Sequence, residues 1–200
     1  LSGDGPVYQV EYTGTGFLVD AGGIVATNRH IAEPWWRNEG VASLLRDGYE
    51  ARFLYLRAFF PGRSQAIPCD RSRTLVSEEA DVALIALSEV ADLPAPILVR
   101  REARVAIGRR VLLLGYPSGI HALLAKSDEG LTDSILAGGD FDPSDVLDTL
   151  AARDAIRPIP TQGHIGDMMK DKVLYDAATA VGGSGGPVLN MDGEVVAINY

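Results

Sequence analysis

The chain has 200 residues, of which 46% are hydrophobic and 22% charged, a composition typical of a folded domain in water. Its net charge of -9 argues against a nucleic-acid partner, because binding to a phosphate backbone depends on clustered Lys and Arg. No apolar run reaches the roughly 18 residues of a membrane helix. The one cysteine, Cys69, has no partner for an intramolecular disulfide and no second thiol or histidine nearby for a metal, so we interpret it as structural or incidental.

Short strand-like runs punctuated by glycine and proline dominate the first half of the chain. Further strand signals follow near the C-terminus, including two runs joined across residues 191–193 as in a β-hairpin. The predicted strand regions are 6–12, 16–27, 51–62, 81–87, 109–117, 172–177 and 187–200. This rhythm is typical of β-barrels or sandwiches, so we predict an all-β fold.

Two segments interrupt the strands with helical patterns. Residues 34–48 place apolar side chains at helical intervals and end at Gly48, which predicts an inserted helix. Within the longer segment 123–157, Asp142 and Pro143 have the character of an N-cap and a first helical residue. Long insertions between strands often carry function, so we predict a functional role for the segment 123–157.

The strongest local motif is VGGSGGPV, in which Ser184 lies between two pairs of glycines just before a predicted strand. Glycine allows a tight turn that exposes the hydroxyl and aims backbone N–H groups at a carbonyl oxygen under attack. The motif therefore predicts Ser184 as a nucleophile, with the N–H groups of Gly182 and Ser184 as oxyanion donors. The alternative is a flexible glycine turn that merely contains a serine.

The same residues also fit the G-x-S-x-G turn of α/β-hydrolases, so the serine alone does not decide the fold. An α/β-hydrolase carries its histidine after the serine, whereas all three histidines here precede Ser184. With an acid between them, the order is histidine, aspartate, serine, which is the order of chymotrypsin and not of subtilisin.

Among the histidines, His30 has the most informative position, directly after an apolar strand in IVATNRHIAEP. A strand end can hold an imidazole in place, as a general base requires. His121 and His164 lack such a position, and we expect a surface or packing role for His164.

The acid that orients the histidine must be held on a strand next to it. Asp81 opens the apolar strand of ADVALIAL, which leaves its carboxylate at the mouth of the core. The alternative is a turn aspartate that caps a strand. We interpret Glu78 and Glu79, in the polar segment before it, as solvated.

Four blocks in order, at residues 14–34, 80–87, 112–117 and 175–200, resemble trypsin-like peptidases of the bacterial Deg, or high-temperature-requirement, type. The predicted helical insertions around 34–48 and 123–157 have no confident counterpart in that family. By position, the resemblance assigns the catalytic triad to His30, Asp81 and Ser184. It places the oxyanion hole at residues Gly182, Gly183 and Ser184.

The chain departs from the wider family at two places. Gly183 stands where digestive and clotting relatives carry the aspartate that pairs with a newly released N-terminus, so that zymogen switch is not expected. The resemblance instead suggests control by loops, with the insertion 123–157 as the candidate. The chain also stops at Tyr200, before the strand that in relatives walls the specificity pocket.

The resemblance further places the floor of the substrate pocket at Ala178, Thr179 and Ala180. These side chains suggest a small or aliphatic residue before the scissile bond. No acid stands at the matching floor position, which argues against a trypsin-like preference for Lys or Arg.

We therefore predict two antiparallel β-barrels of the six-stranded chymotrypsin type with helical insertions, incomplete at the C-terminus. Residues 1–200 would form a single peptidase domain, with barrels at about 1–95 and 96–200. The predicted activity is serine endopeptidase, needing no metal or cofactor, with a protein or peptide substrate and a regulatory partner or further domain outside the chain. The family resemblance favours an extracytoplasmic location. The rival functions are a catalytically silent peptide- or protein-binding module and, requiring a histidine beyond Tyr200, an α/β-hydrolase esterase.

Overall fold

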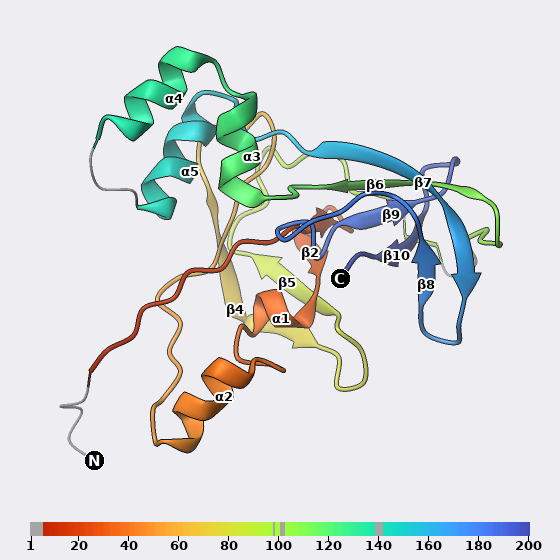
Figure 1. The fold of residues 1–200 in the computed structure, drawn as a ribbon, viewed down its shortest axis with the longest axis horizontal. Coiled ribbons are helices and arrows are strands. Elements are labelled where there is room, and N and C mark those ends of the chain that lie inside the picture. The colour runs from red at the N-terminus through yellow and green to blue at the C-terminus, as the bar shows by residue number, and fades with distance from the viewer. Residues whose placement is uncertain (1–5, 98, 101–102, 139–141) are drawn as a thin grey trace.

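A computed structural model describes residues 6–97, 99–100, 103–138 and 142–200 of the chain. The strands form two separate antiparallel sheets of five strands each (Figure 1). The first has the order β1-β2-β5-β4-β3, and all of its strands lie between residues 17 and 87. The second has the order β10-β9-β6-β7-β8 and lies between residues 110 and 198. These are two curled half-barrels of the predicted chymotrypsin type, each with five strands in the described residues.

Strands β5 and β6 lie within predicted strand regions, whereas β4 and β7 lie outside all of them. In the first sheet they are β1 (Phe17–Leu18), β2 (Ile24–Thr27), β3 (Arg57–Ala58), β4 (Ile67–Val76) and β5 (Ala83–Leu87). In the second they are β6 (Arg110–Gly115), β7 (Ile159–Met168), β8 (Val173–Tyr175), β9 (Pro187–Leu189) and β10 (Val195–Ile198). The prediction of a strand at 6–12 is wrong, since this segment is extended and exposed but pairs with no strand among the described residues.

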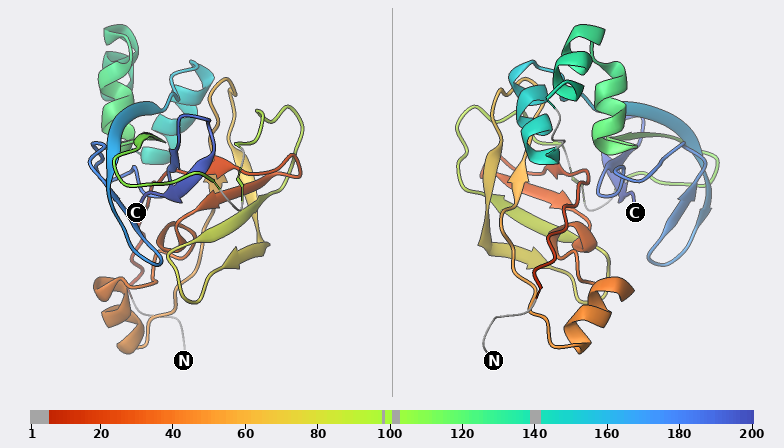
Figure 2. Two further views of the ribbon diagram at one scale, coloured as in Figure 1. Left: turned by 90° about the vertical axis from the view of Figure 1, so that its right-hand side faces the viewer. Right: turned by 60° about the vertical axis from the view of Figure 1, so that its left-hand side comes forward.

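A shared apolar core joins the two sheets. Phe17 and Ala26 of the first sheet belong to the same buried cluster as Leu189 and Val195 of the second. Burial of such side chains is the main favourable term in folding, so this cluster holds the two halves against each other. The two sheets lie side by side in Figure 2.

Helices α3, α4 and α5 lie at one end of the molecule and α2 at the other, while α1 lies between them beside β5 (Figures 1 and 2). Their bounds are α1 (Arg29–Ala32), α2 (Glu39–Arg46), α3 (Gly119–Lys126), α4 (Glu129–Leu136) and α5 (Pro143–Ala152). Helix α2 falls within the predicted segment 34–48. Helix α5 begins as predicted, with Pro143 in its first turn and the Asp142 carboxylate accepting a hydrogen bond from the Ser144 N–H at 2.8 Å. None of the helices in the described residues is long and apolar enough to cross a membrane.

Helices α3, α4 and α5 pack around an apolar core of their own. Its fully buried centre is Leu150. The cluster comprises Ile120, Leu123, Leu124, Leu131, Val146, Leu150, Ala151 and Ile156, with Phe59 and Tyr116 packed against it. Since Phe59 follows β3 and Tyr116 follows β6, the inserted helices rest on both halves of the molecule.

Candidate active site

The register of the first sheet brings His30 and Asp81 to the same end. Strands β2 and β5 are antiparallel, and Thr27 at the end of β2 lies opposite Ala83 at the start of β5. His30 follows Thr27 by three residues and Asp81 precedes Ala83 by two, so both side chains emerge at one edge. The Asn28 side chain, which is 1% exposed, strengthens this arrangement by donating to the Asp81 carbonyl at 2.8 Å.

Asp81 contacts His30 through both carboxylate oxygens. Oδ1 accepts a hydrogen bond from the His30 backbone N–H at 3.0 Å, and Oδ2 lies 2.7 Å from the His30 Nδ1. An ionised carboxylate can only accept hydrogen bonds, so the contact places the imidazole hydrogen on Nδ1. The Nε2 atom then carries the lone pair and is free to accept a proton.

The turn that carries Ser184 meets the end of β2. The Ser184 carbonyl accepts a hydrogen bond from the Thr15 N–H at 2.8 Å. Gly185, at φ +88°, lies so close to the Thr15 carbonyl and the Thr27 hydroxyl that any Cβ there would overlap both atoms. Thr27 is three residues before His30, so the serine turn lies beside the segment that carries the imidazole. Among the described residues, no hydrogen bond joins the His30 imidazole to the Ser184 hydroxyl.

Within the serine turn, two alternate carbonyls are held, and the N–H groups that follow them have no partners among the described residues. The Val181 carbonyl accepts from the Ser118 N–H at 2.6 Å, and the Gly183 carbonyl accepts from Asn199 Nδ2 at 2.9 Å. In a trans peptide the C=O and N–H point in opposite directions. Holding these carbonyls therefore turns the N–H groups of Gly182 and Ser184 to the other side. Neither N–H donates a hydrogen bond in the part of the chain that the structure describes.

Gly182 is confined by the segment that begins α3. Its φ is +95°, a conformation that favours glycine, and a Cβ there would lie 2.5 Å from the Tyr116 carbonyl oxygen. The Ser118 N–H that holds the Val181 carbonyl belongs to the same segment. The inserted helices are thus joined directly to the serine turn.

The predicted pocket-floor residues Ala178, Thr179 and Ala180 are exposed in the loop before the serine turn. The Thr179 hydroxyl accepts from Asn199 Nδ2 at 3.1 Å, and the Ala180 carbonyl accepts from the Gly183 N–H at 2.9 Å. Of the other histidines, His121 lies on α3 and His164 on β7, and both are exposed. Their positions do not bring them into this network.

Two residues of this network were not found from the sequence. Asn199 is 4% exposed, and Tyr175 donates to its Oδ1 at 2.5 Å, which fixes the amide so that Nδ2 faces the Gly183 carbonyl. Burial raises the pKa of Tyr175 to about 12, so the phenol remains a donor at neutral pH. Thr15, flanked by Gly14 and Gly16, contacts the turn from the first sheet. The sequence signal that could have identified Thr15 is its position between two glycines, which allow a close approach of the backbone to another segment.

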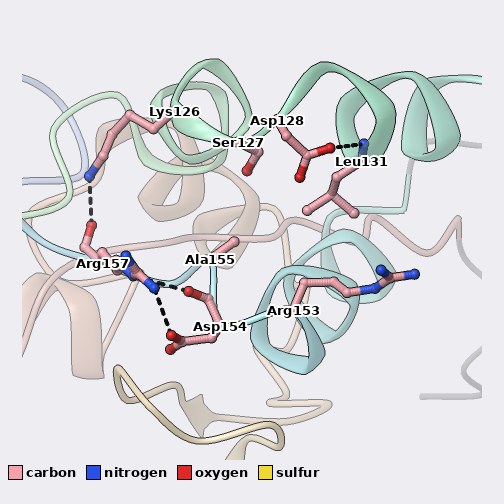
Figure 3. Close-up of a pocket in the computed structure, with 8 residues that line it drawn as sticks. All are labelled: Lys126, Ser127, Asp128, Leu131, Arg153, Asp154, Ala155 and Arg157. Carbon is pink, nitrogen blue, oxygen red and sulfur yellow. Dashed lines mark hydrogen bonds and ion pairs between the residues drawn. The ribbon is translucent and has the colours of Figure 1, made fainter.

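A small pocket lies away from this network, between the inserted helices (Figure 3). Its volume is about 180 Å³, and several of its charged groups contact one another or the backbone. Lys126 Nζ donates to the Arg157 carbonyl at 3.0 Å, and Arg157 pairs with Asp154 at 2.7 Å. This arrangement leaves the triad candidates as the better site.

Known proteins match almost the whole chain. A family model, the trypsin-like peptidase domain, matches residues 14–198. Human Serine protease HTRA4 is 26% identical over 188 residues, which cover 94% of this chain and 30% of that protein. Serine protease HTRA1 of Xenopus laevis is 28% identical, covering 94% and 31%, and Serine protease HTRA1B of Danio rerio is 28% identical, covering 94% and 30%. The chain spans about a third of the length of these relatives.

Proposed function

The chain belongs to the trypsin-like peptidase domain family, and from that premise we propose that it is a serine endopeptidase that hydrolyses peptide bonds through an acyl-enzyme. Its relatives are serine proteases of the high-temperature-requirement type, as the sequence resemblance indicated. They are vertebrate proteins, so the bacterial assignment stays a prediction. The extracytoplasmic location and a regulatory partner or additional domain also stay predictions.

The observation that carries the proposal is the double contact of Asp81 with His30, at 3.0 Å and 2.7 Å. It supports Asp81 as the residue that fixes the imidazole and stabilises the imidazolium when it forms. His30 would be the general base, taking the Ser184 proton at Nε2. Catalytic hydrogen bonds are often long in proteins without substrate, so a serine not yet bonded to the base is compatible with this role.

The reaction then proceeds by acyl transfer. The Ser184 oxygen attacks the peptide carbonyl as its proton moves to His30 Nε2. The resulting oxyanion is bound by the N–H groups of Gly182 and Ser184, with Gly183 between them. His30 returns the proton to the leaving amine, and water then releases the acyl group by the same route. Losing one such donor costs about 2.7 to 4 kcal/mol of barrier, so the geometry of this turn matters nearly as much as the triad.

The proposal includes the substrate as a protein or peptide with a small or aliphatic residue before the scissile bond. The exposure of Ala178, Thr179 and Ala180 leaves their side chains available to such a residue. The nearby Asp176 precedes these floor residues, and one of its carboxylate oxygens accepts the His164 N–H at 2.5 Å.

The inserted segment 123–157 is proposed as the element that controls this site. Its helices are joined to the serine turn through the Ser118 N–H and to the first sheet through Arg57, whose guanidinium lies 2.9 Å from the Asp148 carboxylate. A shift of the helices would therefore be transmitted to the Val181 carbonyl and to the Gly182 N–H behind it.

The test is labelling with a fluorophosphonate probe together with cleavage of fluorescein-labelled casein. We expect labelling and cleavage by the native chain, neither by Ser184→Ala, and both at native levels by Ser88→Ala, which changes an exposed serine elsewhere. Casein cleavage that survives in Ser184→Ala would overturn the assignment of the nucleophile. A native chain that is neither labelled nor able to cleave would favour the silent binding module.

A further inference from the structure

Thr15 connects the serine turn to the strand that leads to His30. Its hydroxyl donates to the Gly182 carbonyl at 2.7 Å, and its backbone N–H donates to the Ser184 carbonyl at 2.8 Å. Its own carbonyl accepts from the Thr27 hydroxyl at 2.7 Å, at the end of β2. One residue therefore holds the peptide that follows Gly182 and the peptide that follows Ser184, and ties both to the segment that precedes the imidazole.

The direction of the Thr15 hydroxyl is set by a neighbour. The Tyr116 N–H donates to Thr15 Oγ1 at 3.1 Å. A hydroxyl has a single hydrogen to donate, and here the Tyr116 N–H occupies a lone pair, which leaves that hydrogen for the Gly182 carbonyl. Thr15 is 4% exposed, so water has little access to replace this contact.

The serine turn needs an external restraint because of its glycines. Gly182 and Gly183 in succession allow more backbone conformations than any other residue pair. The Val181 and Gly183 carbonyls are held by Ser118 and Asn199, as described above, and the peptide between Gly182 and Gly183 is held at its carbonyl by Thr15 and at its N–H by the Ala180 carbonyl. Without the Thr15 contact this peptide loses one of its two restraints, so the backbone of Gly182 is held less firmly and its N–H is aimed less precisely at the substrate.

We propose that Thr15 is a positioning residue for catalysis, holding the Gly182 and Ser184 carbonyls so that the N–H groups of these residues remain aimed at the substrate carbonyl oxygen. This inference rests on the proposed function. Thr15 acts through the turn and makes no contact with the substrate itself. Its hydroxyl is therefore expected to affect the rate of the chemical step and to have little effect on KM.

The test compares Thr15→Val, which has nearly the same shape without the hydroxyl, with Thr15→Ser, which keeps it. Thr74→Val is the matched control, because the Thr74 hydroxyl also donates to a backbone carbonyl, that of Asp70 at 3.5 Å, but within β4 and outside both the serine turn and the inserted segment. Each full chain is assayed at 20 °C for the second-order rate of fluorophosphonate labelling and for kcat and KM on fluorescein-labelled casein. Thermal melts establish that each variant is folded at that temperature.

We expect Thr15→Val to lower both the labelling rate and kcat by about 10- to 100-fold, less than the full loss of an oxyanion donor, with KM within about twofold. Thr15→Ser is expected to stay within about threefold of the native chain, and Thr74→Val to be unchanged. A purely structural role would lower the melting temperature of Thr15→Val without changing its rate at 20 °C. If Thr15→Val does not fold, Thr15→Ala replaces it, with a decrease of at least about threefold expected.

The outcomes separate the two proposals. A native chain that is labelled at the same rate as folded Thr15→Val would overturn the positioning role and leave the peptidase assignment in place. Loss of rate in Thr15→Ser equal to that in Thr15→Val would also overturn it, because the hydroxyl would then not be what matters. A native chain that is not labelled at all would remove both proposals.

Discussion

Replacing Asp81 with asparagine should abolish the basic form of the imidazole while leaving the fold intact. Asp81 receives two hydrogen bonds, from the His30 N–H at 3.0 Å and from the Nδ1 side of the ring at 2.7 Å. The backbone N–H can only donate, so the single oxygen of an asparagine must remain there. The amide NH₂ would then face Nδ1 and donate to it, which forces the ring hydrogen onto Nε2.

The Nε2–H form cannot accept the serine proton, so the expected loss is in kcat. A wrong tautomer of this kind lowers kcat by about 10,000-fold in serine peptidases. The unfolding free energy should change little, because Asp81→Asn keeps the shape of the side chain and both of its contacts.

The assay is initial-rate cleavage of fluorescein-labelled casein, with melting temperature as the measure of folding. Glu79→Gln serves as the control, since it makes the same chemical change at an exposed position two residues away. We expect native rates for Glu79→Gln. A folded Asp81→Asn that keeps a tenth or more of the native kcat would refute the argument that this carboxylate sets the tautomer of His30.

Three further predictions concern the framework around the site. Leu150→Ala should lower the unfolding free energy by about 2 to 5 kcal/mol in urea denaturation, because this side chain is fully buried at the centre of the inserted helices; a change below about 1 kcal/mol would contradict that packing. Burial raises the pKa of Cys69 to about 11, so roughly 0.03% of the thiol is ionised at pH 7.5. Iodoacetamide should modify the folded chain slowly, about tenfold faster for each pH unit up to pH 10, whereas rapid modification at neutral pH would show an accessible thiolate. Arg57→Ala removes the contacts of Arg57 with Asp148 and Ser144, and should make the inserted helices more sensitive to limited proteolysis than in Arg52→Ala, a change of an exposed arginine; equal sensitivity would remove the role given to this brace.

The sequence identified strands best where their side chains are apolar. The run at 81–87 became β5 and the run at 109–117 contains β6, since both strands lie within a sheet and pack on at least one face. The long strands β4 and β7 were missed. They carry Pro68, Pro160 and several charged or glycine residues, and their backbone hydrogen bonds to β5 and β6 hold them in place without an apolar pattern.

Other differences come from interactions between distant segments. The segment 6–12 alternates in polarity like a strand but has no pairing partner among the described residues, and a strand requires one. Helices α3 and α4 were not separated from the inserted segment as a whole, because their apolar residues acquire a helical arrangement only around the shared core with α5.

The triad candidates could be named from the sequence because a chemical motif and the order of the residues along the chain identify them. The contact between His30 and Asp81 depends on the register of β2 against β5, which no local pattern encodes. Thr15 and Asn199 could not be found in this way. Thr15 is separated from Gly182 by 167 positions, and its role becomes visible only when the two sheets are brought together.

The apolar cluster formed by Phe17, Ala26, Leu189 and Val195 ties chemistry to the integrity of the whole chain. The proposed base and its carboxylate come from one half of the molecule and the proposed nucleophile from the other, so neither half alone carries the complete proposed triad. A fragment released by cleavage between the sheets would have no peptidase activity until it bound the other fragment again through this apolar cluster. Cleavage of the chain between the two sheets would thus abolish the proposed activity only if the two halves also dissociated.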